Sequence, residues 1–424
     1  MEKRHILFML EMYYPKPEPN GIVVHQVAKE LIKLGYQVHV ISYRIPGYPN
    51  EDQYDGVFIH RIKKRMFYKL REYGENNINT IKGKISYKLA KIINKIKKLI
   101  YLPWFPLASP TTVIRYYKKA SLLHKKYKFD CVIGVFDPND CLYAGVLFKN
   151  RFKDVKYGSY ILDSLIYLSG QNYLPKRLKE KLTWKFEKMV YENSDIVFNM
   201  ECHRRHHLGG KYEPFQTKMK FLDIPLFIPK KVKMDKRLFD TEKRHLVYMG
   251  SLFRGFRTPD YIYRIFKSIN HKDGYQLHFY TRGSCEEDLL NYQYETGGAV
   301  IRHGFVEHSQ INNIIANADF LINLGVSNST AISSKIFDYM STGKPIIHFY
   351  YNDDDVNLSY FEKYELSLMI KMDESLFEVN VDKVRNFLTI SYGKTIESDT
   401  LLDIFYVNTP MYSASQFDNL TQSI

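Results

Sequence analysis

Cysteine is scarce in this chain of 424 residues, and its few cysteines are scattered. Positions 131, 141, 202 and 285 form neither a metal-ligand spacing nor a redox pair. Four distant cysteines in a chain of this size indicate a reducing compartment. The pattern therefore argues against a fold held together by disulfides.

Long hydrophobic runs are also lacking. The opening MEKRHILFML has only a short apolar run, without the roughly 7–15 apolar residues and the small-residue cleavage site of a signal peptide. No window approaches the roughly 18–20 apolar residues of a membrane-spanning helix. Hydrophobic residues still make up 45% of the chain, which is enough for sizeable cores. We expect a cytoplasmic chain that does not cross a membrane.

Acidic residues are almost absent between residues 61 and 128. This segment holds nineteen lysines and arginines but only two acids, Glu72 and Glu75, so its net charge is +17. The whole chain carries +15, which leaves the remainder close to neutral at −2. The positive charge is therefore a local patch.

Short apolar runs typical of strands alternate with helical patterns in two successive series. The first series has strand patterns at 5–10, 37–43, 129–136, 155–162 and 194–200, with a helical pattern at 21–35. The second has strand patterns at 245–250, 275–280, 298–306, 319–325 and 344–351, with helical patterns at 258–270, 284–295 and 308–317. Such alternation predicts βαβ units and parallel sheets.

The fold class that follows is α/β, with two Rossmann-like domains facing each other across a cleft. We expect the first domain at 1–225, with the basic segment of about 61–128 as an insertion. The second domain is expected at 226–410, after a linker near 225–243. A final helix at 411–424 could cross back to the first domain.

The stretch SSKIFDYMSTGKPIIHFYY, residues 333–351, combines an anion-binding pattern with helix signals. Ser333 or Ser334 can cap a helix of about 334–342, and Gly343 followed by Pro345 ends it. Free N–H groups at a helix start attract phosphate, and Lys335 adds charge. Asp338, three residues later on the same face, can accept hydrogen bonds from ribose hydroxyls. The alternative is an ordinary capped helix in which Lys335 and Asp338 pair.

The same stretch resembles the C-terminal signature of retaining glycosyltransferases of family 4. The segment EMYYPKPEPNGIVVHQVAKELIKLGYQVHVIS resembles that family's opening strand, glycine loop and first helix. HLVYMGSLFRGFRTPDYIYRIF resembles the start of its second domain, and LHFYTRGS and VIRHGFVEHSQINNIIANADFLINLG match looser patterns. The resemblance spans about residues 5–350. It implies the GT-B fold, a nucleotide-sugar donor and retention of anomeric configuration.

One position departs from the family pattern. The family often carries two glutamates eight residues apart, and Asp338 stands in place of the second. Thr330 stands where the first is expected. The resemblance therefore implies that Asp338 binds the ribose. The part of the site near the transferred sugar differs from the family pattern.

Candidate donor-binding residues in the second domain follow from the resemblance and from their places after strands. Arg257, before a helix in FRTP, could clamp a diphosphate and stabilise a leaving nucleotide, and Arg254 competes for this role. Arg282 follows a strand, Gly250 permits close backbone approach, and Val306 belongs to the G-x-V pattern. The remaining donor candidates are Ser334, Lys335 and Asp338, and Lys335 is also a catalytic candidate.

Three residues of the first domain are candidates for the same reasons. Gly21 resembles the family glycine that lets the backbone approach a substrate. Asp137 and Asp163 both follow strands, so each could orient an acceptor hydroxyl or take its proton. Each could equally cap the helix that follows it.

The acidic run 353–355 could suggest a metal site. Three acids after a strand are more often a solvated turn, and the resemblance implies catalysis without metal. We expect no metal and no cofactor besides a donor linked to UDP or GDP.

The helical pattern at 88–102 carries lysines on one side and apolar residues on the other, a combination typical of helices that lie in a membrane interface. We expect Lys91, Lys95, Lys98 and Trp104 to face an anionic membrane surface. The alternative is a surface helix that packs its apolar side on the core.

The resulting hypothesis is a hexosyltransferase at the inner face of the cell membrane. It would move a sugar from a nucleotide-sugar to a glycan or a lipid-linked glycan in surface polysaccharide synthesis. One alternative is an inactive GT-B protein that serves an active transferase, and a GT-B epimerase is a weaker one. A nucleic-acid binder is a further alternative, but the apolar stripe and the absence of a known module argue against nucleic acid.

Overall fold

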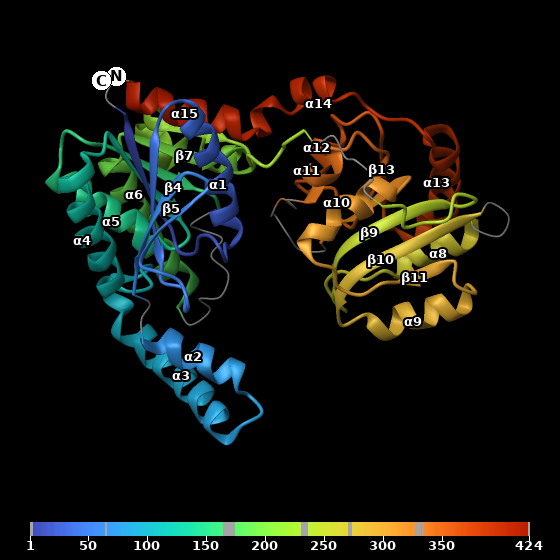
Figure 1. Cartoon of the computed structure of the whole chain (residues 1–424), viewed down its shortest axis with the longest axis horizontal. Coiled ribbons are helices and arrows are strands. Elements are labelled where there is room, and N and C mark those ends of the chain that lie inside the picture. The colour runs from blue at the N-terminus through green and yellow to red at the C-terminus, as the bar shows by residue number, and fades with distance from the viewer. Residues whose placement is uncertain are drawn as a thin grey trace. The chain divides into compact units, whose positions relative to one another are not determined.

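The computed structural model describes residues 3–63, 66–163, 174–229, 236–269, 274–326, 332 and 335–422. Within it the chain forms two compact units (Figure 1). The first unit comprises Met1–Pro225 together with Val407–Ile424, and the second comprises Leu226–Tyr406. The chain thus re-enters the first unit a few residues earlier than the expected boundary at 410.

The first unit is built on an eight-stranded sheet with the order β3-β4-β2-β1-β5-β6-β7-β8. β3 pairs antiparallel with β4, and the other pairs are parallel. Its strands are β1 (His5–Met9), β2 (Gln37–Tyr43), β3 (Glu51–Tyr54), β4 (Val57–Ile62), β5 (Cys131–Phe136), β6 (Lys156–Ile161), β7 (Ile196–Met200) and β8 (Met219–Leu222). Its helices are α1 (Pro19–Lys33), α2 (Met66–Asn76), α3 (Ile81–Ile100), α4 (Pro110–Tyr127), α5 (Asn139–Arg151), α6 (Lys176–Asn193), α7 (Arg204–His207) and α15 (Pro410–Gln422), with 3-10 turns η1 (Leu102–Trp104), η2 (Glu201–His203) and η3 (Gly210–Lys218).

The C-terminal helix α15 packs on the first unit. Phe417 contacts the rings of Phe8, Tyr160 and Phe198. Asp418 pairs with Arg4 and accepts a hydrogen bond from the Tyr36 hydroxyl, at 2.9 and 2.6 Å. Aromatic packing beside a charged pair fixes α15 against the sheet, close to the N-terminal strand (Figure 1).

The second unit has a six-stranded, wholly parallel sheet with the order β11-β10-β9-β12-β13-β14. Its strands are β9 (Arg244–Leu252), β10 (Tyr275–Gly283), β11 (Val300–Arg302), β12 (Phe320–Leu324), β13 (Ile346–Tyr350) and β14 (Ser367–Lys371). Its helices are α8 (Asp260–Ile269), α9 (Glu286–Glu295), α10 (His308–Asn317), α11 (Lys335–Met340), α12 (Leu358–Phe361), α13 (Phe377–Ser391) and α14 (Ser398–Ile404), with η4 (Glu374–Leu376) and η5 (Tyr406–Asn408).

The apolar strands are buried because helices cover the sheets. All residues of β5 and β12 are buried, which is why these runs read as continuous hydrophobic stretches rather than alternating ones. One strand prediction was too long: of 298–306, only Val300–Arg302 pair with β10. Gly304, at φ +76°, lies in the left-handed region and turns the chain away from the sheet.

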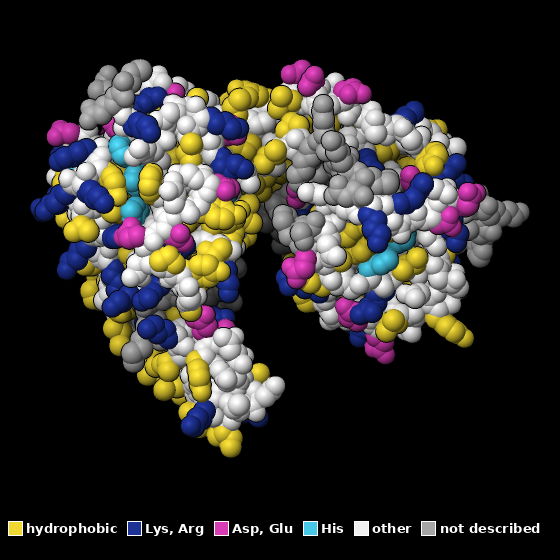
Figure 2. Space-filling model, in the orientation of Figure 1, with side chains coloured by type: hydrophobic (Ala, Val, Ile, Leu, Met, Phe, Trp, Pro, Cys, Tyr) yellow, Lys and Arg dark blue, Asp and Glu magenta, His cyan; other side chains and the backbone are white. Residues whose placement is uncertain are grey.

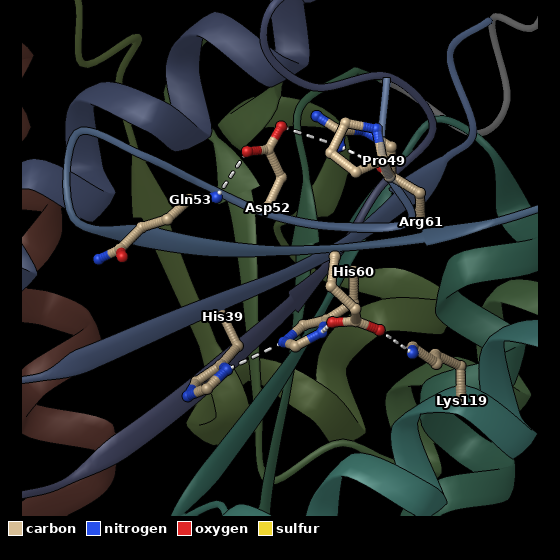
Figure 3. A network of polar contacts seen from close by, with 8 residues as sticks. His39, Pro49, Asp52, Gln53, His60, Arg61 and Lys119 are labelled. Carbon is tan, nitrogen blue, oxygen red and sulfur yellow. Dashed lines mark hydrogen bonds and ion pairs between the residues drawn. The ribbon is translucent and has the colours of Figure 1, made fainter. Parts of the chain in front are cut away.

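Each sheet carries a ladder of three histidines on neighbouring strands. In the first unit, His39 lies between His5 and His60, at 3.2 and 3.1 Å between ring nitrogens. Figure 3 shows the contact of His39 with His60, and the His60 ring also meets the Glu51 carboxylate. Because Glu51 accepts from Nδ1 of His60, each neutral ring donates through Nδ1 and accepts at Nε2. Lys119 pairs with Glu51 at the end of this ladder.

The histidines of the second unit's ladder carry their ring proton on the other nitrogen. His278 lies 2.9 Å from both His245 and His303, again between ring nitrogens. Nε2 of His245 donates to the Asp240 carbonyl at 2.7 Å, so each neutral ring here donates through Nε2. Burial, followed by the neighbouring histidines, lowers the pKa of His39 and of His278 to about 3. The central histidine of each ladder is therefore neutral at physiological pH.

Candidate functional site

The strand order of the second unit brings the carboxyl ends of β10, β9 and β12 side by side. From β9 the chain moves to β10 and β11 on one side, then crosses to β12 on the other side of β9. Such a reversal leaves a crevice at the carboxyl ends of the strands, where open α/β sheets bind ligands. Arg257 lies in the loop after β9, Arg282 lies at the end of β10, and Lys335 is the first residue of α11, the helix that follows β12.

Arg257 and Arg282 each lie close enough to Lys335 to repel its amine. The pKa of Lys335 is lowered by burial first, and then by the charges of Arg257 and Arg282. Asp338 acts in the opposite direction on the same amine. No ion pair is recorded for Arg257, Arg282 or Lys335 within the described part of the chain. The site therefore holds positive charge that an anion would neutralise.

Arg257 gives the most direct evidence of this positive charge. Its backbone is fixed by a bridge to Phe253, with N···O distances of 2.9 and 2.8 Å. Its Nε is buried and has no hydrogen-bond partner among the described residues. A buried donor without a partner is costly unless a ligand supplies an acceptor. Arg257 also opposes the effect of burial on Tyr248, whose pKa rises to about 12.

Gly250 allows Lys335 to reach the end of β9. A Cβ atom at position 250 would lie 3.2 Å from the Lys335 Nζ and 2.7 Å from the Tyr248 hydroxyl. The absence of a side chain therefore leaves room for the amine beside the strand. The prediction that Gly250 is a close-approach position has this geometric basis.

Helix α11 is held against β9 by a buried tyrosine. The Tyr339 hydroxyl accepts a hydrogen bond from the Met249 N–H at 3.1 Å. Gly343, at φ +73°, follows the helix, and a Cβ there would lie 2.3 Å from the Ile396 carbonyl oxygen. The Lys344 Nζ donates to the Ala316 carbonyl at 2.7 Å. Tyr339, Gly343 and Lys344 thus position Lys335 and Asp338, a role that the sequence pattern did not assign to Tyr339 or Lys344.

The structure places the other candidate residues of the second unit in different surroundings. Arg254 forms an ion pair with Asp288 at 2.8 Å and lies within 3.7 Å of Glu287, so it is engaged elsewhere and does not compete with Arg257. The Arg282 guanidinium lies over the Phe305 ring at 5.3 Å and remains exposed. Val306 is partly exposed in the loop after β11, and no contact recorded in the described part joins it to the cations. Thr330, Ser333 and Ser334 lie outside the described residues.

The first unit has the same reversal of strand order, here between β1 and β5. Gly21, near the start of α1, packs so tightly that a Cβ would lie 2.4 Å from the Met12 carbonyl oxygen. The Asn20 side chain donates to the Phe136 carbonyl at 2.8 Å, which ties α1 to the end of β5. Asp137 follows directly, and Asp163 follows β6.

Carboxylates gather at this edge of the first unit. Burial raises the pKa of Asp137, and the nearby Glu18 and Asp163 raise it further. Asp163 also lies 3.8 Å from the His203 imidazole. Sequence reasoning missed Glu18, although its position just before α1 at the end of the first loop is a usable signal. A carboxylate with a raised pKa is suited to accept a proton from a hydroxyl.

The acidic run after β13 is split between different partners. Asp353 pairs with Lys371, whereas Asp355 lies 3.4 Å from His348 and accepts from the Asn357 N–H at 2.9 Å. Asp355 is therefore a turn-forming residue with a partly buried side chain rather than a solvated one. Across the described ranges, no group of three or more metal-ligating side chains comes together.

No family model matches the sequence, and no curated protein matches it. Solved structures do match over nearly its whole length. The lipopolysaccharide outer core galactosyltransferase WaaB matches with a TM-score of 0.55 and 14% identity over 99% of both chains. Anabaena Alr3699/HepE, in complex with UDP and glucose, gives 0.53 and 11%, also over 99% of both chains. The E. coli trehalose-6-phosphate protein with bound UDP-2-fluoro glucose gives 0.57 and 8% over 99% of both chains. These similarities show that the chain has the two-domain α/β fold called GT-B, which confirms the predicted fold class.

Proposed function

We propose that the chain is a glycosyltransferase that moves a hexose from a nucleotide-sugar to a glycan or lipid-linked glycan in surface polysaccharide synthesis. The observation that carries the proposal is the cation cluster of Arg257, Arg282 and Lys335, with the unpartnered Nε of Arg257. A diphosphate supplies the acceptors and negative charge that this cluster lacks. The similar structures include a galactosyltransferase and complexes with UDP or a UDP-sugar.

In this proposal the second unit binds the donor, linked to UDP or GDP. Arg257 and Lys335 stabilise the charge that develops on the leaving diphosphate, and Asp338 accepts hydrogen bonds from the ribose. The first unit binds the acceptor, with Asp137 and Asp163 oriented toward its hydroxyl. We propose retention of configuration, by attack on the same face as the leaving group with the departing phosphate assisting as base. The enzyme works at the inner face of the membrane without a metal.

Calorimetric titration with UDP, GDP, CMP and ADP tests this proposal. We expect one nucleotide to bind, and we expect Asp338→Ala to weaken that nucleotide about tenfold, since a ribose hydrogen bond to a charged group is lost. The matched control is Asp353→Ala, which removes an exposed aspartate that pairs with Lys371 and should leave nucleotide affinity unchanged. If no nucleotide binds to the wild type, the donor site is wrongly assigned.

A second candidate is an inactive GT-B protein that assists an active transferase. The residue that favours it is Thr330, in place of the glutamate that the resemblance leads one to expect. Nucleotide binding without sugar transfer or donor hydrolysis would identify this case. Turnover of the donor by the purified chain would exclude it.

A further inference from the structure

The α2–α3 hairpin is inserted between β4 and α4 and projects from the body of the first unit (Figure 1). Small residues pack its two helices together. A Cβ at Gly83 would lie 1.8 Å from the Asn77 carbonyl oxygen, and one at Gly74 would lie 2.7 Å from the Tyr87 nitrogen. Ser86 donates to the Leu70 carbonyl at 2.8 Å, and Ala90 is buried. The hairpin therefore closes largely through small residues and leaves most of the large apolar side chains of α3 outside the contact.

Those side chains point to solvent. They recur every three or four residues and form one stripe, with exposed fractions of 78% at Ile81, 59% at Ile85, 44% at Leu89, 54% at Ile92, 51% at Ile96 and 70% at Leu99. Hydrophobic side chains are visible along the hairpin in the space-filling view (Figure 2). The alternative in which α3 packs its apolar side on the core is therefore wrong. A contiguous exposed apolar stripe of this kind marks an interaction surface.

The charge beside the stripe has a single sign. At 100° per residue, one edge of the stripe carries the lysines at positions 84, 88, 91, 95 and 98. Helix α3 contains seven lysines and no acid. Trp104, half exposed in the turn after α3, adds an aromatic ring of a kind suited to a membrane interface.

We propose that the stripe of α3, with its lysine edge, docks on the surface of an anionic phospholipid bilayer. The apolar side chains enter the boundary between headgroups and acyl chains, and the lysines contact lipid phosphates. At about 30 Å, the 20-residue helix lies along the interface. Among the described helices, none has the length and apolarity that crossing a bilayer needs.

The charge of α3 favours lipid over a second copy of the chain. A seam between two such helices would bring two lysine edges together with no acid on either helix to pair with them. Like charges along a helical seam oppose association, whereas anionic headgroups neutralise them.

Docking has a consequence for the acceptor, and this step rests on the proposed function. The hairpin leaves the sheet after β4, at the carboxyl edge that also carries Asp137 after β5. A hairpin held on the bilayer thus keeps the carboxylate site of the first unit on the membrane side of its sheet. The acceptor that fits this arrangement is an amphiphile whose sugar lies at the bilayer surface.

Co-sedimentation with vesicles tests the docking surface. The full chain is mixed with vesicles of phosphatidylcholine alone or of equal parts phosphatidylcholine and phosphatidylglycerol. We expect binding to the mixed vesicles that falls with added salt. The triple variant Ile85→Ser, Ile92→Ser, Leu99→Ser should bind at least about tenfold more weakly, because three apolar side chains no longer enter the bilayer. The matched control is Leu122→Ser with Ile390→Ser, two apolar side chains that are 64% and 53% exposed elsewhere.

A second pair of variants tests the lysine edge. Lys88→Gln, Lys91→Gln, Lys95→Gln should weaken binding by roughly fivefold for each lysine. The same three-charge change at Lys125, Lys126 and Lys128, which are exposed on and just after α4, should have a smaller effect. An equal effect of both triples would show general attraction without a docking face.

Two further results would overturn the proposal. One is vesicle binding by the stripe variant that equals the wild type. The other is a wild-type dimer in sedimentation equilibrium that the stripe variant converts to a monomer without any vesicle binding, which would assign the stripe to a second copy. Vesicles are tested without donor, and nucleotide affinity of the stripe variant is measured separately. Loss of the docking surface and failure of the proposed function are therefore distinguishable.

Discussion

The two units share one architecture but carry opposite charge at corresponding places. Each has a parallel sheet whose strand order reverses beside its first strand. At that reversal the second unit gathers Arg257, Arg282 and Lys335, whereas the first gathers Glu18, Asp137 and Asp163. The fold therefore provides a location for a binding site in each unit, and the residues of the loops determine the chemistry of each site. The cationic site suits a diphosphate and the acidic site suits hydroxyl groups.

The largest expected effects come from removing one charged group from each site. Arg257→Ala should lower nucleotide affinity by about 30- to 100-fold, because it removes charge-assisted hydrogen bonds to phosphate. Asp137→Asn should leave nucleotide affinity unchanged and lower the rate of sugar transfer about 100-fold or more. Titration calorimetry and a donor-consumption assay measure the two quantities.

Arg254→Ala is the matched control for Arg257, since Arg254 lies in the same loop but pairs with Asp288. A similar loss of affinity in both arginine variants would mean that loop structure, and not the charge of Arg257, matters. Loss of nucleotide affinity in Asp137→Asn would contradict the proposal that the second unit binds the donor and the first unit binds the acceptor.

The histidine ladders predict a shared weakness toward acid. The pKa of His39 in the folded protein, about 3, lies below its ordinary value of 6.5, so the unfolded chain binds protons first as pH falls. Stability is thus greatest above pH 6.5 and is lost as pH falls toward 3. Between pH 6.5 and 5 we expect His39 to lower stability by about 2 kcal/mol.

Tryptophan fluorescence can follow this loss in the first unit alone, because Trp104 and Trp184 are the only tryptophans and both lie there. Urea unfolding at pH 7 and pH 5 gives the free energies. His39→Leu should reduce stability at pH 7 but flatten its dependence on pH. His278→Leu, the control in the second unit, should leave the fluorescence-detected pH dependence unchanged. A dependence that His39→Leu does not flatten would contradict this assignment.

The smallest effect is expected from alanine at the two close-approach glycines. Gly250→Ala places a methyl group against the Lys335 amine and the Tyr248 hydroxyl, so nucleotide affinity should fall about tenfold with little change in first-unit stability. Gly21→Ala meets the backbone oxygen of Met12 and should destabilise the first unit by about 1–2 kcal/mol. Calorimetry and tryptophan-detected unfolding separate these outcomes. The reverse pattern would place the donor site in the first unit.

Much of the fold could be predicted because its signals are local. Apolar runs of five or six residues and amphipathic stretches indicated most of the parallel strands of both sheets and several of the helices between them, and the 308–317 helix has the predicted bounds. β3, β4, β8 and β14 were not predicted; of these, the charged β3 at the sheet edge has mostly exposed residues and lacks an apolar pattern. The roles of Ser333, Ser334 and Thr330 stay predictions.

By itself, the sequence determined the α/β class, the division into two domains and the candidate cations, since hydrophobic period, capping residues and motif order are local properties. Only the tertiary structure decided that Lys335 reaches Gly250, that Arg254 is engaged by Asp288, that Glu18 joins Asp137, and that the apolar side of α3 is exposed. Each depends on which distant segments pack together. In the α2–α3 hairpin the deciding contacts are made by Gly74 and Gly83, whose lack of side chains lets the chain segments approach closely.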